Sequence, residues 1–515
     1  MSSPLQLLEL RGSIVVAGLV LIFVTAFTFR TILLDKRCSL DAPRWGDHLG
    51  SKARQRTLLT SSKSIYLDNY HKFKDALGFR IQSDGEEKLV ISPRYLDELR
   101  RLPHSVLSFE DAHSESPVTK YTDTPPPKFF HIVPHVTKAR LTPALTRVMP
   151  ILSAEANRVI PLEMGRCREW TAMNIHQRVM RIIAVLAGRV FIGPELCHDE
   201  RYIDAAVNYT IEFGKASQDI EGLTPWMRPF YAKRLKSVMA LRRREESFVD
   251  FMALVIRDRR RTSSKGEKTA DDMLAWLLEQ AARDGSPIDV RHIARTQLAL
   301  FAVAFHTTGL TATNVFFDLA AEPRYIQPLR DQMSQALREE ESDDIQSSRR
   351  LQGLIKLDSF IKESLRFRPL SIATFQRRVL KPTTLSDGQY IPKGTIIEMP
   401  THAMTRDTDH FTNPETFEPW RFAEVRDGEK GRNQFASVSG MLGTFGFGPH
   451  ACPGRFFAAA VLKIVIAGVL VRYDVQMPIA EGGRRQERYK NVEFSLMSSP
   501  DTSKEILVRW IEESC

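Results

Sequence analysis

The sequence predicts one large, mainly α-helical domain with small β-sheets, which follows an amino-terminal transmembrane helix. Three observations lead to this fold class. Of the 515 residues, 43% are hydrophobic and 26% are charged, as in a globular protein with a substantial core. Long stretches have helical periodicity, and one uncharged segment lies near the amino terminus. Because no repeat, low-complexity tract or long linker divides the rest, we expect a lumenal tail at 1–11, a transmembrane anchor at 12–29, a basic linker at 30–59 and a single domain at 60–515.

The uncharged segment runs from Gly12 to Phe29. As a helix it spans roughly 27 Å, close to the hydrocarbon thickness of about 30 Å. A cleaved signal peptide is the alternative, but its apolar core would be shorter and a small-x-small cleavage site would follow. Basic residues are few before the segment and frequent between Arg30 and Arg56, so the positive-inside rule predicts that the large carboxyl-terminal portion faces the cytosol. We therefore expect a single-pass protein of the endoplasmic reticulum membrane, in which the sequon at Asn208 is not glycosylated.

Two turn signals predict hairpins in the domain. Ser83-Asp84-Gly85 lies between two apolar runs within residues 79–92, and Ser386-Asp387-Gly388 separates two further runs. Helix is expected over the stretches with a period near 3.6 residues. These stretches are 143–160, 171–190, 236–258, 271–282, 291–320, 325–339 and 354–367.

The net charge of +10 suits nucleic acid, an anionic membrane surface or an acidic protein partner. The basic runs Arg242–Arg244 and Arg259–Arg261 do not decide among these, because a solvated helix face and a charged loop explain them. The aromatic, proline-containing segment Leu223–Tyr231 has two interpretations. It either packs inside the domain or makes a second contact with the bilayer, where Trp and Tyr suit the interface.

The five cysteines are odd in number, widely scattered and contain no C-x-x-C pair. This pattern is typical neither of a disulfide framework nor of a structural zinc site. It indicates a reducing compartment, where a lone cysteine can be kept for its chemistry. The five are Cys38, Cys167, Cys197, Cys452 and Cys515.

The strongest signal surrounds Cys452, in the run Phe445-Gly-Phe-Gly448-Pro-His450-Ala-Cys452-Pro-Gly454-Arg. It fits the pattern F-x-x-G-x-[RH]-x-C-x-G. The glycines allow the backbone to turn closely around the sulfur. An apolar helix is expected to begin just after Gly454, and a thiolate before a helix amino terminus is stabilised by the free N–H groups and the dipole.

This run resembles the cysteine loop of the cytochrome P-450 family, and the similarity extends from about residue 60 to the end. The resemblance implies that Cys452 is the axial thiolate of haem b iron. It also implies that Phe445 packs beside the sulfur, that Gly448 shapes the loop and that His450 contacts a haem propionate.

Three further segments follow the order of the family. Glu363-Ser-Leu-Arg366 matches its E-x-x-R motif, and Phe417–Phe422 resembles its P-E-R-F segment. The resemblance implies a buried structural triad of Glu363, Arg366 and Arg421, in which the loss of one member leaves an uncompensated charge. Arg378, ten residues before Gly388, is the candidate for a second propionate contact.

The third segment is Val303–Thr308, within the apolar stretch 291–320. By resemblance, Ala304 is the small residue over the iron and Thr307 the threonine that helps to deliver protons to dioxygen. His306 stands where the family usually has Asp or Glu, and ascomycete members that tailor natural products resemble this sequence in having His there. Its imidazole either relays protons near neutral pH or has no catalytic role.

The family's W-x-x-x-R helix departs from the pattern. The corresponding stretch, 131–140, lacks Trp, so His135 or Arg140 is expected to take the propionate contact instead. The substrate pocket is expected to be apolar, with walls from the loop 103–130, the segment Leu370–Thr374 and a strand around Phe494. The pocket residues expected by resemblance are Phe301, Ala304, Phe305, Thr308, Ile372, Ala373 and Phe494.

The resemblance implies a membrane-bound monooxygenase that inserts one oxygen atom of dioxygen into a lipophilic substrate and reduces the other to water. We expect a terpenoid or polyketide substrate. No dinucleotide fingerprint occurs, so electrons must come from a separate NADPH–cytochrome P-450 reductase, with cytochrome b5 as a further donor. Membrane lipid is the other partner, and nucleic acid is not expected. The alternatives are a haem-thiolate isomerase or dehydratase that needs no reductant, and a haem sensor.

Overall fold

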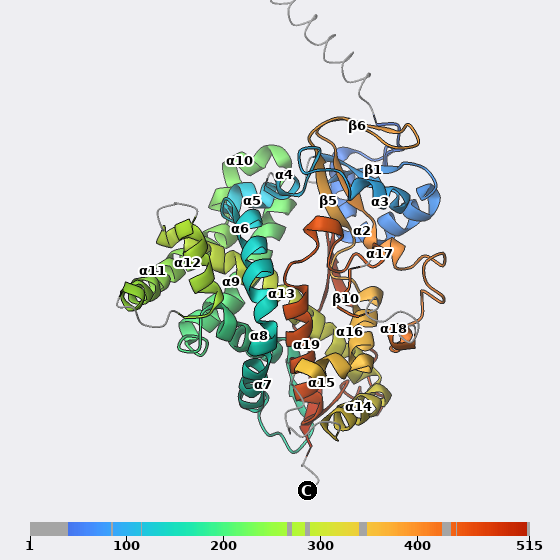
Figure 1. The fold of residues 1–515 in the computed structure, drawn as a ribbon. Coiled ribbons are helices and arrows are strands. Elements are labelled where there is room, and N and C mark those ends of the chain that lie inside the picture. Colours follow the sequence, from blue (N-terminus) through green and yellow to red (C-terminus); the bar gives the residue numbers. More distant parts are fainter. Residues whose placement is uncertain are drawn as a thin grey trace, which may run out of the picture.

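The computed structural model describes residues 40–83, 86–114, 116–264, 270–283, 289–338, 348–424, 434–438, 440–480 and 482–511. The expected anchor and lumenal tail, and also Cys38 and Cys515, lie outside these residues. Helices make up most of the described chain, and the strands β1 and β5 lie together at the upper right of Figure 1, which agrees with the mainly helical fold class with small sheets.

Short helical turns accompany the α-helices, whose bounds are as follows. They are α2 (Ser51–Phe73), α3 (Leu96–Leu99), α4 (Phe109–Ser114), α5 (Pro117–Thr122), α6 (Phe129–Val136), α7 (Thr142–Met164), α8 (Ile175–Phe191), α9 (Glu200–Gly222), α10 (Arg228–Tyr231), α11 (Lys236–Ser264), α12 (Met273–Arg283), α13 (Val290–Ala321), α14 (Ile326–Arg338), α15 (Ser348–Gly353), α16 (Ile355–Phe367), α17 (Thr401–Met404), α18 (Arg421–Glu424) and α19 (Arg455–Leu470).

The strands form a five-stranded sheet in the order β1-β2-β8-β5-β3, a three-stranded sheet β4-β12-β9, and the pairs β10-β11 and β6-β7. All pairs are antiparallel except β2 with β8. The strands are β1 (Gly78–Ser83), β2 (Glu86–Ile91), β3 (Leu107–Ser108), β4 (Thr171–Met173), β5 (Thr374–Val379), β6 (Thr383–Thr384), β7 (Tyr390–Ile391), β8 (Ile396–Met399), β9 (Tyr473–Gln476), β10 (Asn491–Phe494), β11 (Met497–Pro500) and β12 (Ile506–Trp510).

Helix α13 forms the centre of the domain, packed against α8, α9, α11, α16 and α19. Its first turn is capped by the side chain of Asp289, which accepts a hydrogen bond from the backbone N–H of Arg291. Within the described residues, α13 alone is long and apolar enough to cross a membrane, but 72% of its most apolar stretch is buried inside the domain. It is therefore a core helix, apolar on nearly every face.

Both predicted hairpins are confirmed. Strands β1 and β2 pair with Phe79 opposite Val90, and β6 and β7 pair on either side of the second turn, with β5 and β8 beyond them. Gly388 has a φ of +88° in this turn, a conformation that favours glycine. The strand expected around Phe494 is also present as β10.

One helix prediction is wrong at its start. Residues 171–173 form strand β4 rather than the first turn of the helix expected at 171–190, because they pair with β12 far along the chain. The helix starts at Ile175, where the side chain of Asn174 accepts a hydrogen bond from the backbone N–H of Gln177. This pairing depends on a segment more than three hundred residues away, which local periodicity does not reveal.

Candidate active site

The loop that carries Cys452 folds back on itself before α19. The backbone N–H of Cys452 donates to the carbonyl oxygen of Phe445 across 2.7 Å. Gly446 and Gly448 have φ values of +70° and +71°, which residues with a side chain rarely adopt. At Gly448 an added Cβ would also lie 3.3 Å from the Cβ of Arg100. The glycines of the motif are thus required by the backbone path around the sulfur.

The Cys452 sulfur lies at the start of α19 and is half-buried. Burial raises the pKa of its thiol, whereas hydrogen bonds from the backbone N–H groups of Gly454 and Arg455 and the charge of Arg455 lower it. The Arg455 guanidinium also donates to the carbonyl oxygen of Cys452 at 2.9 Å. These donors face an acceptor sulfur, as the sequence predicted for a thiolate at a helix terminus.

Basic and aromatic side chains gather beside this loop. The His450 ring stacks on Phe109 with centroids 5.4 Å apart, and the Lys138 ammonium donates to the Pro449 carbonyl oxygen at 3.3 Å. Burial is the main cause that lowers the pKa of His450 to about 4, and the charge of Arg377 contributes.

The Arg377 guanidinium is the buried member of this cluster. It lies 5.1 Å from the Phe109 ring centroid and 4.4 Å from that of Phe375, and burial lowers its pKa to about 10. Its Nη1 donates a hydrogen bond to the carbonyl oxygen of Gln376, and no carboxylate among the described residues pairs with it. A buried cation in such surroundings calls for an anionic partner.

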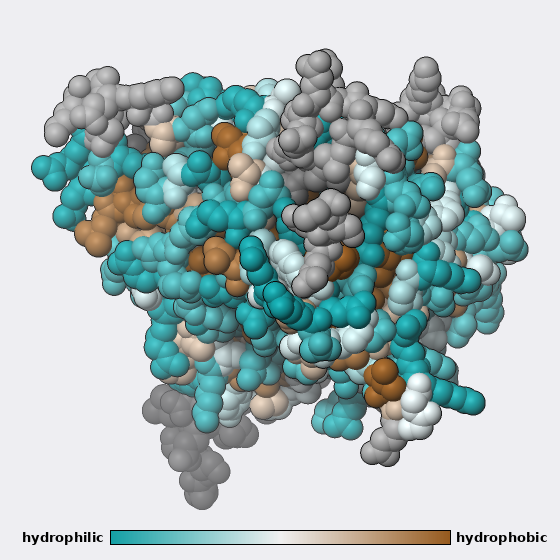
Figure 2. Space-filling model, turned by 90° about the horizontal axis from the view of Figure 1, so that it is seen from below, coloured by the Kyte–Doolittle hydropathy of each residue, from teal (hydrophilic) through white to brown (hydrophobic). Residues whose placement is uncertain are grey.

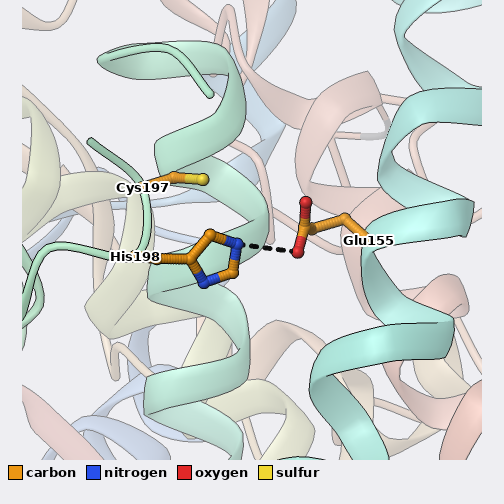
Figure 3. Close-up of side chains that lie close together, drawn as sticks. All are labelled: Glu155, Cys197 and His198. Atoms are coloured by element: carbon orange, nitrogen blue, oxygen red, sulfur yellow. Dashed lines mark ion pairs between the residues drawn. The ribbon is translucent and has the colours of Figure 1, made fainter. Parts of the chain in front are cut away.

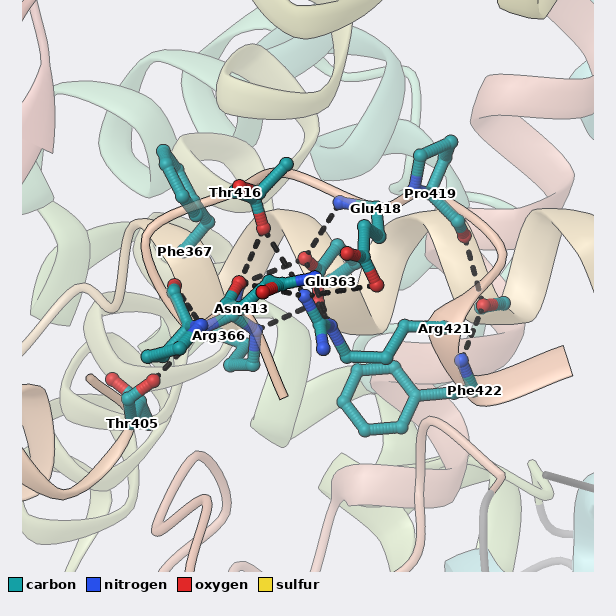
Figure 4. Close-up of polar contacts among 12 residues, drawn as sticks. Glu363, Arg366, Phe367, Thr405, Asn413, Thr416, Glu418, Pro419, Arg421 and Phe422 are labelled. Carbon is teal, nitrogen blue, oxygen red and sulfur yellow. Dashed lines mark hydrogen bonds and ion pairs between the residues drawn. The ribbon is translucent and has the colours of Figure 1, made fainter. Parts of the chain in front are cut away.

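The expected triad of Glu363, Arg366 and Arg421 is brought together by α16 and the first residue of α18 (Figure 4). Arg366 donates from Nε and Nη2 to the two oxygens of Glu363 at 2.7 and 2.8 Å, and both side chains are fully buried. Arg421 Nε lies 3.3 Å from Glu363 Oε2. Arg366 Nη1 additionally donates to the carbonyl oxygens of Thr405 and Pro414.

One face of α13 is open, although the rest of the helix is buried. Val303 is 54% exposed and Thr307, one turn later, is also exposed, with Ala304 partly exposed beside them. The Thr307 hydroxyl donates to the Val303 carbonyl oxygen at 3.0 Å. An exposed valine on the central helix of a domain indicates a space that another group fills.

His306 lies next to this face. Burial lowers its pKa to about 4, so the imidazole is neutral at physiological pH. A neutral imidazole carries one N–H donor and one acceptor nitrogen, which suits the relay interpretation and does not test it.

Comparison with known proteins decides the family. The sequence profile described as Cytochrome P-450 matches residues 135–503. The chain is 34% identical to cytochrome P-450 monooxygenase ATR3 of Stachybotrys chlorohalonatus, over 82% of this chain and 88% of that protein. It is 31% identical to cytochrome P-450 monooxygenase penP of Penicillium crustosum, over 87% and 86% of the two chains. It is 30% identical to ent-kaurene oxidase of Fusarium fujikuroi, over 87% and 83%. The chain belongs to the cytochrome P-450 family.

As a cytochrome P-450 it is an oxidoreductase, a monooxygenase that uses haem b and dioxygen with NADPH electrons delivered by a reductase. The residues present fit that cofactor. The Cys452 sulfur faces two backbone N–H donors. Arg377, which pairs with no carboxylate among the described residues, lies beside His450, where anionic propionates would neutralise its charge. Lys138 on the neighbouring helical segment adds a second cation.

In this cytochrome P-450 the side chain of Arg378 has a carboxylate partner of its own. It follows Arg377 on β5, so its side chain points to the opposite face of the strand, where it pairs with Glu86 at 3.2 Å. Of the stretch 131–140, His135 is exposed and Arg140 pairs with Glu279 at 2.7 Å on the surface. Arg378 and Arg140 thus have carboxylate partners within the protein, and the propionate contacts expected for all three residues stay predictions. Arg377 and Lys138 were missed, and the alternation of β5 is the signal that would have separated Arg377 from Arg378.

Most expected pocket walls lie in the core instead. Phe301 and Phe305 are fully buried and stack on Phe191 of α8, whose ring also stacks on Phe457 of α19. Thr308 is buried and its hydroxyl donates back to the Ala304 carbonyl oxygen. The face that carries these residues is opposite Val303 and Thr307 on the helix. Phe301, Phe305 and Thr308 therefore pack in the core and Ala304 lies on the open side, while their expected role in the pocket stays a prediction.

The remaining wall segments lie side by side. The backbone N–H of Ile372 donates to the Leu496 carbonyl oxygen at 2.8 Å, and that of Ser498 donates to the Leu370 carbonyl oxygen at 3.0 Å. Ile372 and Ala373 are buried in a small apolar cluster with Tyr66 and Phe79, whereas Phe494 is partly exposed. Ile372 and Ala373 therefore pack inside this apolar cluster and do not form an open surface.

A second cluster lies away from the cysteine loop, between α7 and the turn before α9. Figure 3 shows Cys197 and His198 facing Glu155, with His198 Nε2 at 2.9 Å from Glu155 Oε1. Their donor atoms lie within 4.8 Å of one another. The Arg158 guanidinium contacts both Glu155 and His198, so an ion-pair network accounts for the arrangement.

Proposed function

We propose that this chain is a membrane-bound monooxygenase that hydroxylates or otherwise oxidises a lipophilic small molecule in fungal secondary metabolism. The observation that carries the proposal is the open face of α13. Val303 and Ala304 present an apolar surface there, and Thr307 supplies its hydroxyl group. An apolar wall with few polar groups suits a bulky lipophilic substrate.

The proposed role of each residue follows from its surroundings. Cys452 holds the iron through its sulfur, with the Gly454 and Arg455 N–H groups stabilising the negative charge. Arg377 and His450 bind the propionates, and Lys138 adds charge. When bound, haem supplies the activation of dioxygen and its insertion into a C–H bond.

On the open face, Thr307 moves a proton through its hydroxyl group. His306, neutral at physiological pH, exchanges protons with its surroundings through its two ring nitrogens. Val303 and Ala304 orient the apolar part of the substrate and exclude water from it. The buried triad of Glu363, Arg366 and Arg421 holds α16 rigidly against the chain around α18.

Membrane attachment is proposed to have two parts, an anchor at 12–29 and the segment Leu223–Tyr231. Trp226, Phe230 and Tyr231 are all exposed around α10, which argues against the alternative of buried packing. Gln55 of α2 donates to the Glu221 carbonyl oxygen at 3.2 Å, so the first described helix lies beside this segment. The opposite face of the molecule is mostly hydrophilic, with small separate apolar areas (Figure 2). One end of the domain thus suits lipid and the other suits water.

The relatives support a natural-product substrate. One of them is named for the oxidation of ent-kaurene, and we propose a terpenoid or a polyketide-type compound of similar lipophilic character for this chain. We propose NADPH–cytochrome P-450 reductase of the endoplasmic reticulum as the electron donor, with cytochrome b5 as an additional one. The net charge of +10 favours docking to an acidic flavoprotein surface.

The first experiment is the carbon monoxide difference spectrum of dithionite-reduced microsomes that contain the full chain or Cys452→Ser. We expect a strongly red-shifted Soret band in the wild type that is absent from the variant. A band that persists in Cys452→Ser would contradict the ligand assignment. Lipophilic compounds are then screened for a spin-state change, and turnover that requires reductase and NADPH distinguishes a monooxygenase from an isomerase or dehydratase.

A further inference from the structure

Glu245 of α11 is a buried carboxylate at the meeting point of four elements. It is 6% exposed. Its Oε1 accepts hydrogen bonds from the Tyr209 hydroxyl of α9 at 3.0 Å and from the Thr124 hydroxyl, just after α5, at 3.1 Å. Its Oε2 lies 3.6 Å from Arg295 Nε of α13, which is buried and has no hydrogen-bond partner among the described residues. The Glu245 carboxylate therefore links α11 to α9, to α13 and to the connection that follows α5.

Other charged groups hold the same connection. Arg295 Nη2 donates to the Asp123 carbonyl oxygen at 2.6 Å. Arg242 of α11 donates to the Tyr121 carbonyl oxygen at 3.4 Å and lies 3.5 Å from the Asp123 carboxylate. Residues 121–124 are thus bound through both backbone and side-chain atoms to α9, α11 and α13. We refer to residues 121–124 as the strap.

The strap continues directly into the site. Helix α6 begins at Phe129, and Phe130 packs against Phe109 with ring centroids 5.3 Å apart. Phe109 in turn stacks on His450 of the cysteine loop. The chain after the strap therefore spans from α11 and α13 to the side of the site where the propionates are expected. Movement of the strap away from Glu245 would move this span.

We propose that Glu245 is a positioning residue that fastens the strap to α9, α11 and α13 and thereby controls how fast ligands reach and leave the haem pocket. Release of the strap removes the Thr124 hydrogen bond from a buried carboxylate and leaves Arg295 without the Asp123 carbonyl oxygen, so both buried groups must regain water or another partner. Opening is consequently slow while Glu245 is in place. The same contacts are broken on the way in and on the way out, so both rates fall together.

The neighbouring Glu246 provides a matched control. It forms an ion pair with Arg291 and so links the same two helices, α11 and α13. Both of these side chains are exposed, and neither makes a described contact with the strap. Glu246→Gln therefore changes charge and helix–helix linkage in the same way as Glu245→Gln but leaves the strap fastened.

The test uses full-length, haem-loaded enzyme and 4-phenylimidazole as a bulky probe of the haem pocket, followed by stopped-flow absorbance at the Soret band. In Glu245→Gln we expect association and dissociation rate constants that both rise roughly tenfold, because a hydrogen bond to a charged group is weakened. The equilibrium dissociation constant should change less than about twofold, since both rates change together. An intact carbon monoxide difference spectrum checks that each variant is folded.

Thr124→Val removes the strap's own hydroxyl and should reproduce the acceleration, and the double variant should be no faster than Glu245→Gln. Equal rates in the wild type, Glu245→Gln and Thr124→Val would overturn the proposal. An equal acceleration in Glu246→Gln would also overturn it, because the effect would then come from general loosening between α11 and α13. A merely structural role of Glu245 would lower stability without changing both rate constants by the same factor.

Discussion

The Arg366 guanidinium binds both carboxylate oxygens of Glu363, at 2.7 and 2.8 Å, and neither side chain is exposed to solvent. Two backbone carbonyl oxygens occupy the remaining donors of Nη1. The pair is therefore a fully satisfied buried contact that joins α16 to the chain around Thr405 and Pro414. Glu363 and Arg366 are three residues apart in sequence, whereas the carbonyl oxygens that accept the remaining hydrogen bonds lie about forty to fifty residues later in the chain.

Removal of one member should be strongly destabilising. In Arg366→Met the Glu363 carboxylate stays buried without its bidentate partner and keeps only the Arg421 contact, so we expect a loss of about 3–5 kcal/mol in the free energy of unfolding and little haem-containing protein. Arg147→Met is the control, because Arg147 pairs with Asp271 at 2.6 Å on the surface, where both are exposed. That change should cost under about 0.5 kcal/mol. Chemical denaturation followed by Soret absorbance measures both, and equal losses would contradict the buried role.

Arg377 and Arg378 should differ in haem retention. Arg377 is buried beside His450 and pairs with no carboxylate in the part of the chain that the structure describes, whereas Arg378 pairs with Glu86 on the other face of β5. We expect Arg377→Gln to lose haem roughly tenfold faster, because a charge-assisted contact to a propionate is removed. Arg378→Gln should remain within about twofold of the wild type. The rate of haem transfer to excess apomyoglobin measures this, and a faster loss from Arg378→Gln would reverse the assignment.

Phe301 and Val303 should separate stability from ligand binding. Phe301 is fully buried against Phe191, Tyr202 and Phe248, so Phe301→Ala should lower the free energy of unfolding by about 3–5 kcal/mol. Val303 lies on the open face, so Val303→Phe should change stability by less than about 1 kcal/mol. The larger ring should nevertheless abolish most of the spin-state change that a bulky substrate produces. Normal substrate binding in Val303→Phe would show that the open face is not part of the pocket.

The stability of the domain should depend on pH through His402. Burial is the main cause that lowers its pKa from 6.5 to about 3. Between these values the unfolded chain binds a proton that the folded protein does not, so stability rises with pH in this window and is lost on acidification. The variant His402→Gln should therefore show a smaller loss of unfolding free energy between pH 7 and pH 4.5. Urea titrations at four pH values measure the slope, and an unchanged slope would exclude His402 as a contributor.

The cysteine loop and the buried triad could be predicted from sequence, because their chemistry is confined to short motifs with fixed spacing. Cys452, Gly448 and Arg366 occupy positions at which sterics or charge pairing permit few alternatives. The hairpins were predictable for the same reason, since glycine and aspartate at the turns set the register. Such features are local, and local sequence is sufficient for them.

The sequence did not reveal in which direction individual side chains point, nor which distant segments pair with one another. A shift of one residue along β5 moves a side chain to the other face of the strand, and this separates Arg377 from Arg378. On α13 almost every position is apolar, so periodicity does not show that Val303 faces open space while Phe301 faces the core. Strand β4 depends on a partner near the carboxyl terminus. In each case the deciding neighbour lies far away in sequence.

The Phe191 ring has a consequence for how such an enzyme can diversify. It stacks on Phe305 of α13 and on Phe457 of α19, only five residues after Cys452, so one side chain outside the pocket sets the separation of the two helices. The distance between α13 and the helix that follows Cys452 is therefore set in the core, independently of the open face of α13. If Val303 and Ala304 face the substrate as proposed, substitutions there would change which substrates are accepted while the distance between α13 and α19 is preserved.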